Sequence, residues 1–138
     1  MMDLSHFDDL IEGQDRGAEL RIKHPVTNET MPEMVLTIAG PDSDVQRRAH
    51  LLMTDELYAF RGRPPAVDQE RLIIERLARC VVGWSVKQDG KPLEFTFTNV
   101  VRILTKFRFV RDQVEVFAED RTPYFFRALP AANEVQTR

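Results

Sequence analysis

Apolar side chains are densest between Thr98 and Phe126, where their spacing predicts two amphipathic helices, over residues 98–107 and 109–120. Positions three or four residues apart share one helix face. That spacing is followed by Val100, Ile103, Leu104 and Phe107, and then by Val110, Val114, Phe117 and Ala118. Other apolar residues fall off this face, namely Phe109, Val116, Tyr124, Phe125 and Phe126. Because a soluble monomer seldom exposes that much apolar surface, we expect part of this segment to contact another protein chain.

Alternating apolar and polar positions predict a β-hairpin over residues 17–40. The first strand, residues 17–24, places Ala18, Leu20 and Ile22 on one side and charged residues on the other. Residues 34–39 predict the second strand, and Asn28 in the turn between them tolerates a left-handed backbone. A lone hairpin is marginal in water, so it needs helices or a neighbouring chain to cover it.

Two further helices are predicted between the hairpin and Thr98, over residues 43–61 and 67–82. Ser43 and Gln46 have the spacing of a capping box at the start of the first. The second is apolar over more than half its circumference, which indicates a buried helix or a subunit contact. Gly83 is expected to end it, Asp89-Gly90 to form a turn, and Thr98 to cap the next helix.

These elements predict an α+β fold, mainly α-helical, in which an N-terminal β-hairpin is followed by about four helices. Residues 17–128 are expected to form one globular domain. The acidic residues 1–16 are either a docking arm or a flexible terminus, and the sparse apolar pattern favours the flexible terminus. Residues 129–138 are expected to be a flexible tail.

The amino-acid composition makes some classes of function less plausible than others. The 138 residues are 43% hydrophobic and 30% charged, with a net charge of −3, which disfavours a nucleic-acid-binding protein. The chain has no N-terminal secretory pattern and no apolar run near the roughly 18 residues of a membrane helix. It is therefore expected to stay in the cytoplasm, away from membranes.

Residues that could carry chemistry are scattered. His6, His24 and His50 lack the spacing of a zinc site, and Cys80 lies in an apolar helix where a thiol behaves as a small hydrophobe. Asp42 and Asp44 lie where carboxylates cap helices. No glycine-rich loop resembles a phosphate site. We therefore expect no catalytic, cofactor or metal site.

Aromatic residues suggest a protein-binding surface instead. Trp84 is either a surface anchor, as is common at interfaces, or a core residue at the end of the second helix, and core burial is favoured. The aromatic clusters at residues 107–109 and 124–126 suit protein contact better than base stacking. The residues expected to contact a partner are Val110, Val114, Phe117, Tyr124, Phe125, Phe126 and Trp84.

The order of four segments resembles the tail assembly chaperone family of long-tailed (siphovirus-like) bacteriophages and prophages. These segments are LRIKHPVTNE, GPDSD, VVGWSVKQDGKPLEFTFTN and VRDQVEVFAEDR, within residues 17–126. The chain departs from the family in having Asn28 where a glycine is common, and residues 107–109 where a proline and an aromatic are common. Without that proline, the last two helices could run on as one.

The resemblance implies a non-catalytic protein that binds the tape measure protein and helps recruit tail tube subunits during tail assembly. Many such proteins have a frameshift-extended form that contacts the tube protein, and this chain resembles the short form. The resemblance also implies self-association, action in the bacterial host cytoplasm and absence from the mature virion. The alternatives are a structural tail protein (a tube or connector component) retained in the particle, or a small nucleic-acid-binding regulator.

Overall fold

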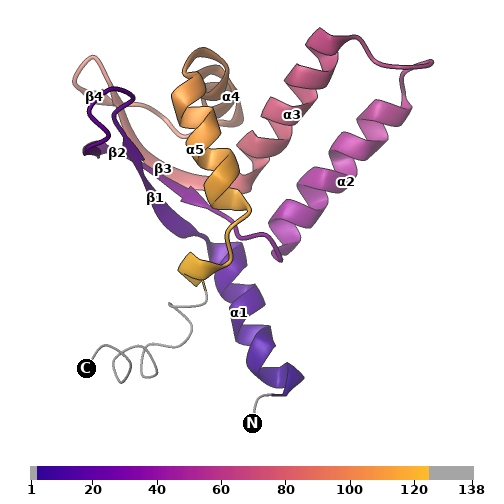
Figure 1. The fold of residues 1–138 in the computed structure, drawn as a ribbon, viewed down its shortest axis with the longest axis horizontal. Helices are drawn as coiled ribbons and strands as arrows, with labels where there is room; N and C mark the ends of the chain where they lie inside the picture. The colour runs from indigo at the N-terminus through magenta and orange to yellow at the C-terminus, as the bar shows by residue number, and fades with distance from the viewer. Residues whose placement is uncertain (1–2, 125–138) are drawn as a thin grey trace.

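The fold is a four-stranded antiparallel sheet with helices packed on one face (Figure 1). The computed structural model describes residues 3–124, and residues 122–124 form a helical turn at the end of this range. The elements are, in order, α1 (Leu4–Arg16), β1 (Ala18–Lys23), β2 (Thr30–Ile38), α2 (Asp44–Tyr58), α3 (Ala66–Cys80), β3 (Val81–Gln88), β4 (Lys91–Pro92), α4 (Phe97–Lys106) and α5 (Arg108–Ala118).

The sheet has the order β1-β2-β3-β4, and its register explains the alternation in the sequence. Leu36 lies opposite both Leu20 on β1 and Trp84 on β3, so apolar residues of three strands share the covered face. The expected hairpin is confirmed, but β3 was missed. The apolar residues at the end of α3 and the start of β3 continue one helical spacing, so the sequence does not mark where the helix ends. The pairing of β3 with β2 joins residues far apart in the chain, which local periodicity cannot detect.

The expectation that residues 1–16 form a flexible terminus is wrong for residues 4–16, which form helix α1 ahead of the hairpin. Asp3 caps this helix by accepting a hydrogen bond from the backbone N–H of Ser5. At the other end Gln14 is buried against the loop between β2 and α2. The spacing of apolar residues within this segment could not reveal where it docks, because Asp42, which bonds to Gln14, lies 28 residues further along the chain.

Helices α2 and α3 form a hairpin beside the sheet, close to the predicted bounds of 43–61 and 67–82 (Figure 1). Ser43 caps α2 as expected, since its Oγ accepts from the N–H of Gln46 at 3.1 Å. The capping box itself does not form, because the Gln46 side chain donates to the carbonyl oxygens of Ala39 and Ala118 instead. α3 ends at Cys80 because Val81 is extended and begins β3.

The last two helices are separate and do not run on as one, and their bounds are close to the expected 98–107 and 109–120. Phe107 breaks them with φ −109° and ψ 87°. Its N–H donates to Ile103, and its carbonyl accepts from Val110 and Arg111 in the next helix. The cap of α4 is Thr96, not Thr98. The turn predictions are confirmed, since Asn28 and Asp89 both have positive φ, 60° and 55°.

Candidate protein-binding site

An apolar cleft of about 290 Å³ lies between the sheet and the junction of α4 with α5. Its apolar lining comes from β2, β3, the segment after β4 and both helices: Met31, Met34, Val86, Leu93, Ile103, Phe107 and Phe109. The volume is at the lower end of the roughly 300–1,000 Å³ typical of small-molecule sites. Methionine and phenylalanine are adaptable, contact-rich side chains, so the cleft suits the apolar side chains of a protein partner.

The edge of this apolar cleft is mainly basic. Lys87, Arg102 and Lys106 line it together with one acid, Glu33. The Lys106 ammonium lies 5.6 Å from the centre of the Phe107 ring, and Arg102 donates to the side chain of Gln88 at 3.1 Å. An apolar floor with a basic edge favours a partner that presents apolar side chains beside carboxylates.

The break at Phe107 lies in the wall of the cleft. The rings of Phe107 and Phe109 pack edge to face at 6.1 Å, and both line the cleft where the chain changes direction. α5 is held in place further along by Gln113, whose amide bonds to both backbone groups of Lys23 at the end of β1. The cleft wall is therefore fixed to the sheet.

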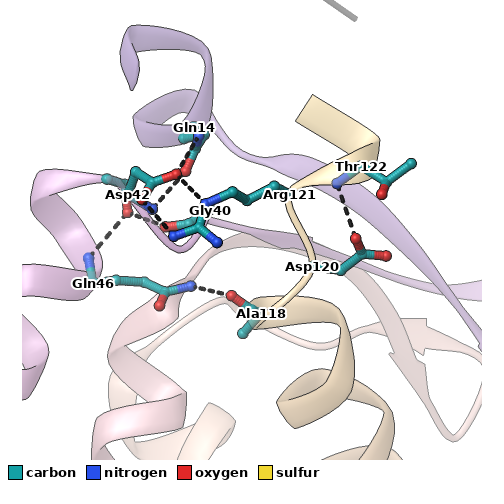
Figure 2. A network of polar contacts seen from close by, with 9 residues as sticks. Gln14, Gly40, Asp42, Gln46, Ala118, Asp120, Arg121 and Thr122 are labelled. Atoms are coloured by element: carbon teal, nitrogen blue, oxygen red, sulfur yellow. Dashed lines mark hydrogen bonds and ion pairs between the residues drawn. The ribbon is translucent and has the colours of Figure 1, made fainter. Parts of the chain in front are cut away.

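A polar junction holds the opposite end of α5 (Figure 2). Asp42 forms two hydrogen bonds with the Arg121 guanidinium, at 2.7 and 2.9 Å, and its N–H donates to Gln14 Oε1 at 2.6 Å. Gln46 links the start of α2 to Ala118 at the end of α5. We call these contacts of Gln14, Asp42, Gln46 and Arg121 the Asp42 junction. Asp42 thus pairs with a remote arginine instead of capping α2.

The Arg121 guanidinium holds the pKa of Asp42 below its ordinary value of 3.8, because it hydrogen-bonds to and neutralises the ionised carboxylate. Burial acts in the opposite direction and the Gln14 amide in the same direction, both more weakly. The carboxylate is therefore charged at neutral pH and keeps the C-terminal end of α5 attached to the loop.

Val110 and Val114, which we expected to contact a partner, are core residues with 0% of their surface exposed. Both pack with residues of the sheet and of α3. Their helical spacing therefore reflects burial within this chain, and their side chains offer no surface to a partner in this structure. Val116, on the other face of α5, is 72% exposed.

The remaining expected contact residues divide between core and surface. Tyr124 is buried, and its hydroxyl donates to the carbonyl of Ile38 at 2.5 Å. Phe117 is half-buried and packs edge to face on Tyr124. Phe125 and Phe126 lie outside the described residues. Apart from those two, the structure does not bring the expected contacts together into one surface.

Trp84 lies on β3, not at the end of a helix. It is half-buried, its indole N–H donates to the carbonyl of Leu93 at 2.9 Å, and its ring packs on Phe95. Leu93 also lines the apolar cleft. Trp84 therefore fixes the return of the chain after the β3–β4 turn by holding Leu93, which lines the cleft.

Reactive groups, metal ligands and long apolar helices also bear on function within residues 3–124. Burial raises the pKa of the Cys80 thiol to about 11, which keeps it protonated and unreactive. No three metal-binding side chains gather in this range. Nor does any of its helices have the length and apolar character needed to cross a bilayer.

The residues that form the cleft were largely missed from sequence. Phe109 lies off the buried face in the sequence pattern, but Met34 was predicted only as a strand residue, and Met31 lay outside both predicted strands. The available signal was the Phe-Arg-Phe triplet at residues 107–109, where two aromatics flank a charge and cannot both follow one helix face. Comparison of the chain with family models, with curated proteins and with solved structures finds no match.

Proposed function

We propose that this chain is a non-catalytic tail assembly chaperone of a long-tailed phage or prophage, which binds the tape measure protein through the apolar cleft. The cleft is the observation that carries the proposal. A tape measure protein is a very long helical protein with apolar stripes, and an amphipathic helix laid in an apolar groove is a common mode of peptide recognition. In this role the protein works in the host cytoplasm, helps recruit tail tube subunits and leaves before the virion matures.

The cleft replaces the valines of α5 as the proposed contact. Val86 and Ile103 are buried at its base, but its other residues are partly exposed or exposed and come from several elements, so a partner side chain can enter without unfolding the chain. Methionines at such a surface repack around different apolar side chains, as binding along a long repetitive partner requires. The basic edge adds selectivity for stripes flanked by carboxylates.

A structural tail protein is the second candidate, because edge strand β1 could pair with a neighbouring copy. The Gln113 contact with Lys23 occupies part of that edge and counts against it. Mass spectrometry of purified particles separates the two: a chaperone is absent from them, whereas a structural component is present in a fixed amount.

Co-expression with the longest helical protein encoded beside this chain tests the proposal. The soluble amount of that protein is compared for the wild type, for Met31→Ser and Phe109→Ser in the cleft, and for Val116→Ser on the exposed face of α5. We expect the wild type and Val116→Ser to keep the long protein soluble and bound, and the cleft variants to lose it while still melting cooperatively. Equal capture by all four proteins would contradict the proposed site.

A further inference from the structure

Helix α1 carries an apolar stripe that the described chain leaves exposed. Leu4, Phe7 and Ile11 are 82%, 40% and 42% exposed, and their spacing of three and four residues places them on one face. A stripe of this kind usually faces a core, and isolated helices of fewer than about 12–15 residues are marginal in water. α1 has 13 residues, so a surface that covers the stripe would stabilise it.

The exposed part of α1 is also acidic. Residues 3–12 contain Asp3, Asp8, Asp9 and Glu12 and no lysine or arginine. Asp8 and Glu12 are one turn apart and adjacent in helical order to the stripe. α1 therefore presents apolar side chains beside carboxylates, the combination that matches the apolar cleft with its edge of Lys87, Arg102 and Lys106.

One chain cannot bring its own α1 to its own cleft. α1 leads into β1 at the end of the sheet where Ala18 pairs with Ile38, and Gln14 holds it there by its bonds to Gly40 and Asp42. The cleft lies toward the other end of the sheet, where Met34 pairs with Val86 and the chain turns into β4. In Figure 1, α1 also points away from the body of the molecule.

We propose that α1 of one copy docks in the apolar cleft of a second copy. The contact joins two different surfaces, so it is head-to-tail and builds either a ring or an open chain. This proposal rests on the proposed function in one respect. When the tape measure protein also binds the apolar cleft, it competes there with α1 of the neighbouring copy, and α1 covers the cleft until the tape measure protein binds.

Charge reversal of the purified chain, without any partner, tests the contact. The first variant carries Asp8→Lys with Glu12→Lys on α1, and the second carries Lys87→Glu with Lys106→Glu on the cleft edge. Sedimentation velocity at low salt measures self-association. Each variant should associate about tenfold more weakly than the wild type, because attraction becomes repulsion at the edge of the contact. Added salt should weaken wild-type association.

Mixing the two charge-reversed variants is the decisive experiment. In the mixture, the reversed α1 meets the reversed cleft edge, and the remaining contacts pair an original α1 with an original edge. Association should therefore return toward the wild-type level, although neither variant associates well by itself. Damage to the fold would not be repaired by mixing. A mixture as weak as its components would overturn the proposal.

Replacing an apolar side chain by an uncharged polar one checks the stripe independently of charge. Leu4→Ser should reduce association, whereas Leu51→Ser on α2, where Leu51 is 48% exposed, should leave it unchanged. A wild type that remains monomeric at all concentrations would refute the docking of α1. Because capture of the long helical protein is measured separately, it could still succeed, and the proposed function would then stand without this contact.

Discussion

The side-chain amide of Gln113 makes the two hydrogen bonds with Lys23 that a neighbouring strand would make. It accepts from the Lys23 N–H at 2.8 Å and donates to the Lys23 carbonyl at 3.0 Å. Lys23 ends β1 at one edge of the sheet. Unpaired edge groups invite pairing with other chains, so α5 protects the edge as well as covering the core.

Replacing Gln113 with methionine keeps the length of the side chain and removes both bonds. We expect the free energy of unfolding in urea to fall by about 1 kcal/mol, because the released groups of Lys23 can still reach water. Aggregation on heating should increase. Asp112→Asn, at the exposed neighbouring position, is the control and should stay within about 0.5 kcal/mol of the wild type. Unchanged stability of Gln113→Met would show that the contact is dispensable.

Gly40→Ala should loosen α1. A Cβ at residue 40 would lie 2.6–2.7 Å from three atoms of Gln14, including its Cβ, so rotation of the side-chain tip cannot relieve the overlap. We expect a loss of about 1–3 kcal/mol in urea unfolding and faster proteolysis of residues 4–16. Gly83→Ala is the matched control, since its new Cβ would meet nothing closer than 3.9 Å. The Gly40→Ala effect should shrink in part when Gln14 is also changed to alanine, which removes two of the three overlapping atoms and keeps the Cβ.

The ion pair of Asp42 with Arg121 predicts a pH-dependent contribution to stability. Folding lowers the pKa of Asp42 below 3.8, so the contribution is present above about pH 4 and disappears as the pH falls through the lowered pKa. Asp42→Asn should therefore be less stable than the wild type in urea at pH 7, and the difference should be smaller at pH 2, because the carboxylate protonates as the pH falls through the lowered pKa. A difference of the same size at both pH values would mean that charge is not responsible.

Val114→Ala should destabilise the protein by about 2–3 kcal/mol, because it removes two buried methyl groups and leaves a cavity. Val116→Ala, two residues away and exposed, should change stability by less than about 0.5 kcal/mol. Thermal or urea unfolding measures both. If Val114→Ala unfolded like the wild type but lost a partner, the assignment of Val114 to the core would be wrong.

Local chemistry in the sequence predicted most of the separate elements of the fold. The hairpin alternation around Leu20 and Ile22, the cap at Ser43 and the turns at Asn28 and Asp89 depend on neighbouring residues, and the structure contains all of them. Strand β3 was missed, and a docked arm at residues 1–16 was the less favoured alternative, because each depends on a remote partner. β3 needs β2, and α1 needs the loop at Gly40.

The site was harder to predict than the fold, for the same reason. Spacing identifies Val110 and Val114 as one apolar face, but it cannot tell whether that face meets the chain's own sheet or another protein. The cleft collects side chains from positions as distant as Met31 and Phe109. Their proximity follows from the pairing of β2 with β3 and from the break at Phe107, neither of which can be read from a local window.

The Asp42 junction also sets an order of events during synthesis. Gln14 precedes Asp42 by 28 residues and Arg121 follows it by 79, so the ribosome delivers the three in turn. Helix α1 can attach to the loop early, but the ion pair that secures α5 must wait until Arg121 has left the ribosome. Until then the apolar face of the β1–β2 hairpin lacks much of its helical cover. The nascent chain is therefore most prone to aggregation in the interval between the emergence of β2 and that of α5.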